Sequence, residues 1–398
     1  MAIRFNKETK NSYQMLQSRI DNGSLIVGVL GAGQLAKMLA NDAYRLGLRF
    51  ATIEDKPGSP ATFMTKLDFS GSGNDRERLD NFINNVDVIT LENEFIDPEI
   101  LEYIEQLKPV YPSSKTLNLI QDKYIQKNTF RDAGLELPNY QKMDNIEDCK
   151  EFGASFGYPF VLKSRKYGYD GYGNETVDSE EEIETAFNNL TKNNKSGLLA
   201  ESFVNFTKEL AVMVARSKNG EVVVYPCVET IQRNHICHKV IAPAQIDEKI
   251  AEKAKRYAVK CVEAINGIGV FGIELFLTDD GQVLVNEIAP RPHNSGHYTI
   301  EGCYTSQYEN AIRAITGLPL GNTDLIMGAA CMINLLGERD GSGVPRSPDK
   351  MLAKKAKLHL YNKSESRVGR KMGHITAIAS TTKEAVSIAE DAANSFKW

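Results

Sequence analysis

Two alternating hydrophobic runs in GVFGIELFLTDDGQVLVNEIAP, residues 269–290, constrain the fold more than any other stretch. They flank Asp280-Gly281, a pair typical of two-residue β-hairpin turns. If these two residues form the loop, the register places Glu274 directly opposite Glu287. Opposed residues have Cβ atoms about 4.5–5.5 Å apart, so two ionised carboxylates there repel each other. The pattern therefore predicts a hairpin in which a shared proton, a basic side chain or a metal ion offsets this repulsion.

The residues that follow this hairpin are rich in hydrogen-bonding groups. The stretch NEIAPRPHNSGH, 286–297, surrounds one arginine with prolines, histidines, asparagines and a serine. Neither a packed core nor a plain turn needs so many polar side chains at the end of a buried strand. We interpret the stretch as part of a binding site.

The segment up to about residue 120 alternates strands with helices. LIVGVL at 25–30 is a strand, and GAGQLAKMLANDAYRLG opens a helix with apolar residues at helical spacing. Such alternation predicts a parallel, doubly wound sheet. GAGQLA at 31–36 also fits the weak form of the dinucleotide fingerprint. That motif leaves three alternatives open: a nicotinamide site, a structural turn, or a helix N-terminus that holds a phosphate.

The segment 121–316 contains a lysine beside a glycine-rich loop. GYPFVLKSR is a strand that ends near Lys163, and KYGYDGYGNETV follows it. An ammonium group and flexible backbone amides can neutralise the oxygens of a nucleoside triphosphate. The lysine and the loop favour a metal between the hairpin carboxylates, because Mg²⁺ binds one or two carboxylates together with substrate phosphates. The alternatives are a mobile hairpin with a surface lysine, and a shifted hairpin register.

The segment 317–398 has a buried strand, CMINLLG, and then a basic cluster between two further strands. The cluster contains Lys363, Arg367, Arg370 and Lys371. It is either a solvated loop or a phosphate site, since arginine binds phosphate oxygens bidentately.

Composition limits the class of protein. The 398 residues carry a formal net charge of -5, which argues against a general nucleic-acid binder. The apolar runs are strand-sized, so we expect no membrane span. The first 24 residues lack a hydrophobic signal core, and the six cysteines include no CxxC pair. We therefore expect a cytoplasmic protein with reduced thiols.

Taken together, these motifs resemble the ATP-grasp superfamily and, within it, the N5-carboxyaminoimidazole ribonucleotide synthetase family. The resemblance extends over nearly the whole chain after residue 24. The motifs that carry it are GAGQLAKM, ITLENEF, YPFVLKSR, GYDGYGN, TKELAVMVARS, VFGIELF, NEIAPRPHNSGHYT and GRKMGH. It implies an α/β fold with an N-terminal extension (1–24), a doubly wound parallel-sheet domain (25–120), a central ATP-grasp domain (121–316, mobile lid about 150–204) and a small C-terminal α+β domain (317–398).

The resemblance also implies an activity. ATP would phosphorylate bicarbonate to carboxyphosphate, and the amine of 5-aminoimidazole ribonucleotide would then take up the carboxyl group. The cofactors would be ATP and Mg²⁺, with two ions expected, and the protein would be a homodimer. The central segment is similar to the fungal form, in which a mutase domain is fused to this enzyme. Because the chain stops at Trp398, we expect a separate mutase to use the product.

Roles for individual residues follow from the same resemblance. Carboxyphosphate chemistry would involve Arg291, Tyr169, Asp170, His293, Asn294 and Ser295. ATP would meet Lys123, Lys163, the loop Gly168, Tyr169, Asp170, Gly171, Tyr172, Gly173 and Asn174, then Glu201, Ser202, Phe203, Val204, Glu209, Gln232, Asn286 and Glu287. The ribotide would meet Gly33, Gln34, Leu35, Lys363, Arg370 and one of Glu92 and Glu94. Glu274 and Glu287 would bind the metal.

Two positions depart from the family pattern, and several rivals remain. Tyr172 stands where the loop usually has arginine or lysine, and Gln232 stands where a histidine is expected.

The nearest rival is the formate-dependent glycinamide ribonucleotide transformylase, whose corresponding stretch resembles PRPHDTG, whereas this chain has Asn294-Ser295. Biotin carboxylase, a nicotinamide-dependent dehydrogenase built on GAGQLA and a non-catalytic nucleotide-binding regulator are the others.

Overall fold

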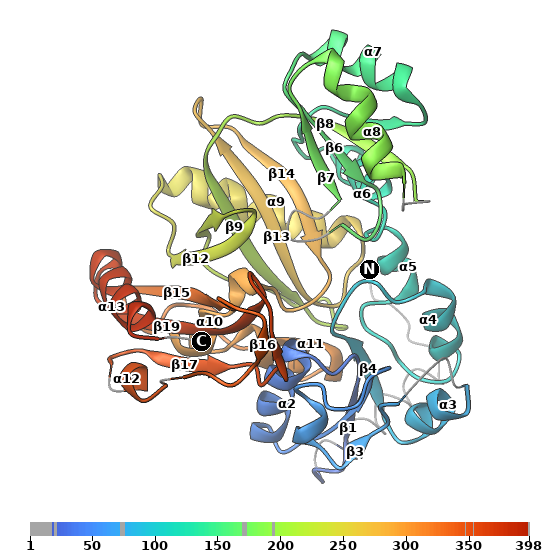
Figure 1. Ribbon diagram of the computed structural model, residues 1–398. Helices are drawn as coiled ribbons and strands as arrows, with labels where there is room; N and C mark the ends of the chain where they lie inside the picture. The colour runs from blue at the N-terminus through green and yellow to red at the C-terminus, as the bar shows by residue number, and fades with distance from the viewer. Residues whose placement is uncertain are drawn as a thin grey trace.

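The computed structural model describes residues 18–19, 22–71, 76–168, 173–192, 196–346, 348–352 and 354–396. Most of the predicted extension 1–24 lies outside these ranges. Figure 1 shows the N-terminal segment at the base, a small sheet at the top and the large sheet between them, with the C-terminal strands of that sheet at the lower left. Among the helices of the described ranges, none is both long and apolar enough to cross a membrane.

The N-terminal segment forms the predicted parallel sheet. Its described strands run in the order β3-β2-β1-β4, and all of their pairings are parallel. They are β1 (Ile26–Leu30), β2 (Arg49–Ile53), β3 (Leu67–Asp68) and β4 (Val88–Leu91). The alternating helices are α2 (Gln34–Arg45), α3 (Arg76–Asn84), α4 (Pro98–Glu105) and α5 (Ser114–Asn118). Helix α2 packs against one face of the sheet, and α3 and α4 pack against the other. This places the start of α2 at the carboxyl end of β1.

The small sheet at the top is antiparallel, in the order β5-β8-β6-β7, and helices α7 and α8 pack against it. Its members are β5 (Tyr140–Met143), α7 (Ile146–Phe156), β6 (Phe160–Ser164), β7 (Asn174–Val177), α8 (Ile183–Thr191) and β8 (Leu198–Ser202). The unit has its own core, built around Phe152 and Phe160. It begins with β5, earlier than the predicted lid boundary at residue 150.

The large antiparallel sheet runs β14-β13-β9-β11-β12-β15-β19-β17, with β10 beside β9. Its strands are β9 (Phe206–Arg216), β10 (Val222–Val224), β11 (Val228–Arg233), β12 (Ile236–Ala242), β13 (Gly269–Thr278), β14 (Val283–Ala289), β15 (Ala329–Leu336), β17 (Lys357–Leu360) and β19 (Lys371–Ala379). The helices around it are α6 (Lys123–Asp132), α9 (Glu248–Ala264), α10 (Thr299–Gly302), α11 (Gln307–Thr316), α12 (Pro348–Leu352) and α13 (Thr382–Asn394), and a short pair joins β16 (Gly341–Ser342) to β18 (Glu365–Ser366). Strands of the central and C-terminal segments therefore belong to one sheet, joined where β12 pairs with β15.

The hairpin pairs Glu274 with Glu287 as predicted, but its turn and its register near the turn differ from the prediction. Leu277 faces Val283, and the backbone N–H of Thr278 donates to the carbonyl of Gln282, so the turn has three residues and the two-residue loop was wrong. Gly281 takes the positive φ that such a turn needs. A bulge between Glu274 and Leu275 then restores the predicted pairing, because it adds one residue to β14.

Candidate active site

One large cleft opens where the N-terminal sheet, the small sheet and the large sheet meet. Its volume is about 1210 Å³. Eighteen of the predicted site residues line it, from segments far apart in the sequence. They are Gln34, Leu35, Glu92, Glu94, Lys123, Lys163, Gly168, Asn174, Glu209, Gln232, Glu274, Asn286, Glu287, Arg291, His293, Asn294, Lys363 and Arg370. The structure thus brings the predicted nucleotide, metal and ribotide residues into one space.

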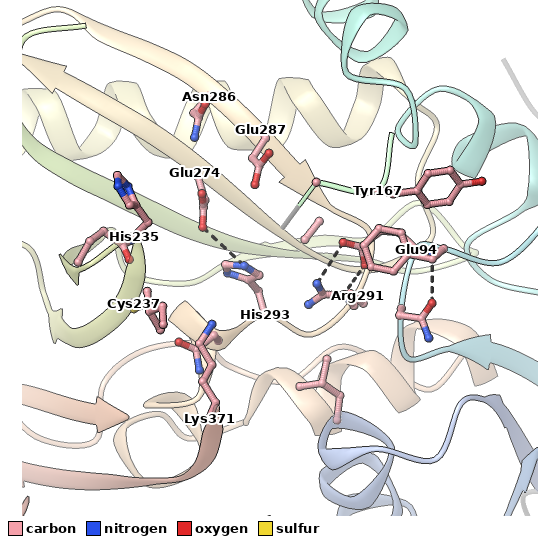
Figure 2. A pocket seen from close by; sticks show the side chains of 18 of the residues that line it. Glu94, Tyr167, His235, Cys237, Glu274, Asn286, Glu287, Arg291, His293 and Lys371 are labelled. Carbon is pink, nitrogen blue, oxygen red and sulfur yellow. Dashed lines mark hydrogen bonds and ion pairs between the residues drawn. The ribbon is translucent and has the colours of Figure 1, made fainter. Parts of the chain in front are cut away.

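Glu274 and Glu287 face each other across β13 and β14, as Figure 2 shows. Burial, together with the Glu287 and Glu209 carboxylates, raises the pKa of Glu274. Burial also acts on Glu287, but the Lys123 ammonium, which donates to Glu287, outweighs it and lowers the pKa of that carboxyl. The ring of His293 approaches the other carboxylate, with Nε2 3.6 Å from Oε1 of Glu274. Burial and two neighbouring carboxylates therefore outweigh the cations near Glu274 and favour its protonated form.

This donor set fits Mg²⁺. Within the described residues, no group of three or more histidine, cysteine or acidic side chains is arranged to hold a metal ion. Mg²⁺ does not need one, because it binds one or two carboxylates and takes its other ligands from water and substrate phosphates. The raised pKa of Glu274 marks a carboxylate that a nearby cation would stabilise in its ionised form.

Three lysines and a buried glutamate form a charged cluster on the side of the small sheet, and Lys123 and Lys163 of this cluster line the cleft. Nζ of Lys163 lies 2.9 Å, and Nζ of Lys127 3.2 Å, from the carboxylate of Glu201. Lys123 begins α6, where its backbone N–H donates to the carbonyl of Arg165 at 2.9 Å, so the helix start is tied to the glycine loop. Sequence analysis missed Lys127. The signal was available, since residues 123 and 127 lie on one face of a helix.

Several predicted nucleotide contacts do not line the cleft. Glu201 is 2% exposed, Ser202 ends β8, and Phe203 and Val204 lie in the link from β8 of the small sheet to β9 of the large one. Gly173 lies in the turn before β7 with φ near 79°, a conformation that favours glycine. Tyr169, Asp170, Gly171 and Tyr172 lie outside the described residues.

Arg291 links the N-terminal segment to the end of β14. Its guanidinium makes a bidentate pair with Glu94, with Nε and Nη2 at 2.6 and 3.1 Å from the two carboxylate oxygens. The pair lies inside the cleft beside His293 (Figure 2). Sequence analysis placed Arg291 and Glu94 in the site separately and could not predict that they pair.

The residues after Arg291 are held in place by hydrogen bonds to one another and to β15. Ser295 is buried, and its hydroxyl lies 2.9 Å from Nδ1 of His293, so it positions that ring. Asn294 exchanges amide hydrogen bonds of 2.9 and 2.6 Å with Asn334 on β15, a partner that sequence analysis missed. A Cβ at Gly272 would overlap His293, so this glycine lets the turn lie against β13.

Glu92 occupies the start of α2. Its carboxylate accepts from the backbone N–H groups of Gly33 and Leu35, the latter at 3.0 Å. A Cβ at Gly33 would overlap Glu92, which explains a glycine at that position. Burial raises the pKa of Glu92, with nearby Glu54 acting in the same direction. The glycine motif therefore binds an anion at the N-terminus of α2, and that anion is a side chain of the protein itself.

The basic cluster lines another wall of the cleft, with Lys363, Arg367, Arg370 and Lys371. Lys363 donates to the carbonyl of Lys371 at 2.7 Å, and Arg370 donates to the carbonyl of Glu365 at 2.7 Å. Burial and the neighbouring Arg367 lower the pKa of Arg370. Repelling cations gathered in a cleft are typical of a phosphate site.

Comparison with known proteins identifies three consecutive family domains. Residues 25–121 match the ribonucleotide synthetase preATP-grasp domain, 128–308 the ATP-grasp domain, and 330–387 the phosphoribosylaminoimidazole carboxylase C-terminal domain. Phosphoribosylaminoimidazole carboxylase of Schizosaccharomyces pombe is 42% identical over 90% of this chain, and the chain spans 66% of that relative's length.

Relatives of similar length give the narrower assignment. N5-carboxyaminoimidazole ribonucleotide synthase of Bacillus subtilis is 39% identical over 88% of this chain and 90% of its own length. The crystal structure of the Thermotoga maritima synthetase matches with a TM-score of 0.83 and 39% identity, covering 94% of this chain and 99% of that one. An Aspergillus clavatus synthase in complex with ADP and 5-aminoimidazole ribonucleotide matches with a TM-score of 0.84 and 36% identity, covering 93% and 98%. These matches argue against the dehydrogenase alternative. The chain belongs to the N5-carboxyaminoimidazole ribonucleotide synthetase family, within the ATP-grasp proteins.

Proposed function

We propose that this chain uses ATP and bicarbonate to carboxylate 5-aminoimidazole ribonucleotide on its exocyclic amine. The products are N5-carboxyaminoimidazole ribonucleotide, ADP and phosphate. The observation that carries the proposal is the order of groups along one cleft. In Figure 2 the opposed carboxylates lie on one side of His293 and Lys371 of the basic cluster lies on the other, with Arg291 beside His293. A nucleotide and a ribotide can therefore bind together with their reactive groups at the centre.

At the nucleotide end, Lys123 and Lys163 neutralise phosphate oxygens, and Glu209 and Gln232 line the wall for the nucleoside. Glu274 and Glu287, with Asn286 beside them, would hold Mg²⁺, with two ions expected. When bound, the metal would neutralise charge on the phosphates, which is the main requirement of phosphoryl transfer. The ion pair between Lys123 and Glu287 holds both side chains in position for the nucleotide.

At the centre, Arg291 and His293 stabilise the carboxyphosphate formed from bicarbonate and the γ-phosphoryl group. The ribotide amine then takes up the carboxyl group as phosphate leaves and one proton is released. Arg291 is already oriented by Glu94, so little side-chain freedom is lost when an anion binds. The small sheet, which carries Lys163 and the glycine loop, excludes water from a labile intermediate.

At the ribotide end, Lys363 and Arg370 bind the phosphate together with the turn of Gln34 and Leu35. Of the two candidate carboxylates, Glu92 is the better ribotide contact, because it accepts from the backbone of that turn whereas Glu94 is engaged by Arg291. Its oxygens can accept from ribose hydroxyl groups as well as from backbone N–H groups. A homodimer remains a prediction from the family resemblance.

The test is ADP release from ATP, Mg²⁺ and bicarbonate, with and without 5-aminoimidazole ribonucleotide. We expect the ribotide to stimulate release strongly. Glycinamide ribonucleotide plus formate, assayed in parallel, should not stimulate it. Stimulation by that pair alone would refute the proposal and favour the transformylase.

A further inference from the structure

His297 ends the polar stretch after β14 and has no role in the mechanism described above. It is 2% exposed, yet it is one of the residues that line the cleft. It follows the short turn Asn294–Gly296 and precedes α10. A buried histidine at the edge of a substrate cleft raises the question of which ring nitrogen carries the proton.

The side chain of Gln307 answers that question, because its own orientation is fixed by backbone groups. The backbone N–H of His293 can only donate, and it donates to Oε1 of Gln307 at 2.9 Å. The amide nitrogen of Gln307 in turn donates to the carbonyl of His293 at 2.8 Å. Two contacts with one backbone residue thus assign oxygen and nitrogen of this amide without ambiguity.

The same amide nitrogen lies 3.1 Å from Nδ1 of His297. An amide NH₂ group can only donate, so Nδ1 must accept and carries no proton. The hydroxyl of Tyr308 lies 2.9 Å from the same Nδ1 and can donate to it as well. His297 therefore has its ring proton on Nε2.

The ring is also neutral and held in one orientation. Burial, then the nearby His293, His359, Lys371 and Arg291, lower the pKa of His297 well below its usual range. The His374 ring packs beside it with centroids 4.9 Å apart. Protonation of the ring is therefore resisted by its surroundings, and rotation of the ring is resisted by packing.

The proton on Nε2 points to a ligand. Within the described ranges, no protein group accepts a hydrogen bond from this nitrogen, since all of the ring's hydrogen bonds are made by Nδ1. The ring nevertheless reaches the cleft, because His297 is one of the residues that line it. The residue lines the cleft near Arg291 and Lys371, at the ribotide end and away from the lysines of the small sheet.

We propose that His297 binds the ribotide as a neutral imidazole and donates its Nε2–H to an acceptor atom of that substrate, either a phosphate oxygen or the unprotonated ring nitrogen. Gln307 and Tyr308 act through it as positioning residues that fix the tautomer. A neutral donor adds a directed hydrogen bond in a place where the neighbouring side chains already supply positive charge. The inference rests on the proposed function for the identity of the substrate, but not for the tautomer.

The tautomer is tested first, without any assay of activity. Nitrogen chemical shifts of ¹⁵N-histidine-labelled protein, with the His297 signals identified by their loss in His297→Ala, report which nitrogen is protonated. We expect the proton on Nε2 in the ligand-free protein from about pH 6 to about pH 8. In Gln307→Glu, one carboxylate oxygen keeps the bond from the His293 N–H while the other accepts from Nδ1–H, so the proton should move. A proton on Nδ1 in the unsubstituted protein would overturn the inference.

Substrate binding is tested next by steady-state kinetics. His297→Ala should raise the KM for the ribotide about 10-fold, the value of one hydrogen bond, with the KM for ATP unchanged. Gln307→Glu keeps the ring and should produce a similar rise, which guards against a folding defect in His297→Ala. The dephosphorylated riboside separates the two acceptors: the effect of His297→Ala disappears with it if the phosphate is the acceptor, and persists if the ring nitrogen is.

The two proposals fail in different ways. If the ribotide stimulates ADP release but neither variant changes its KM, the inference about His297 is wrong and the proposed function stands. If the unsubstituted protein shows no response to the ribotide, the proposed function fails, and the ribotide as the partner of His297 fails with it.

Discussion

The two ends of the cleft handle charge in opposite ways. At the nucleotide end, carboxylates face one another, and lysines bind them from the side, as Lys123 does with Glu287 and Lys163 with Glu201. At the ribotide end, Lys363 and Arg370 are gathered on one wall and donate to backbone carbonyl oxygens. The first arrangement is completed by a cation and the second by an anion. The difference indicates which ligand group belongs at which end, before any ligand is present.

The largest expected effect breaks the nucleotide end. Glu287→Ala should lower ATP hydrolysis at least about 100-fold, since loss of a metal ligand costs more than loss of an outer partner. It also leaves Lys123 without its carboxylate. ADP release over a Mg²⁺ titration measures the effect, and Asp279→Ala in the exposed hairpin turn is the control. Normal hydrolysis by Glu287→Ala would show that the carboxylate pair is not the metal site.

The next effect is confined to the ribotide end. Arg370→Ala should raise the KM for the ribotide about 10-fold to 100-fold, the value of a charge-assisted contact with phosphate, and leave the KM for ATP unchanged. Initial rates at varied ribotide and saturating ATP measure it. Arg346→Ala, an exposed arginine of the same segment that does not line the cleft, is the matched control. An equal rise in both KM values would mean that the two ends are not independent.

A smaller effect concerns the residue between the two ends. Glu94→Ala should lower kcat about 10-fold, because Arg291 loses the partner that orients it. In an Arg291→Ala background, the same substitution should have little further effect. A double-mutant cycle on kcat measures this coupling, with Glu102→Ala on α4 as an exposed control. Additive losses would show that Glu94 acts on its own.

The smallest effect is a pH dependence of stability. Burial and the neighbouring glutamates raise the pKa of Glu274 to about 8. The folded protein therefore holds a proton that the unfolded chain has lost, so this group costs stability as the pH rises from the ordinary carboxyl range toward 8. Without Mg²⁺, Glu274→Gln should raise the unfolding temperature by about a degree or two at pH 8 and leave it unchanged near pH 4. Differential scanning fluorimetry at both values tests it, and an equal shift at the two would contradict the raised pKa.

Local patterns could be predicted from sequence, whereas contacts between distant residues of the site could not. The parallel sheet follows from local periodicity, and the pairing of Glu274 with Glu287 was correct although the three-residue turn and the bulge were missed. Contacts such as Arg291 with Glu94, or Asn294 with Asn334, join residues 197 and 40 positions apart. Pattern within one strand or helix carries no information about such pairs. For that reason the sequence placed residues in the site but did not show which of them hold one another.

The pairing of β12 with β15 has a mechanical consequence. The hairpin of β13 and β14 and the strands that carry the basic cluster belong to one hydrogen-bonded sheet, so the chain has no flexible connection between separate sheets near residue 316. The small sheet, by contrast, leads into this large sheet through the short link 203–205 between β8 and β9. Limited proteolysis near residues 317–328 should thus leave two fragments that stay associated, and refolding them as separate pieces would expose an open sheet edge on each.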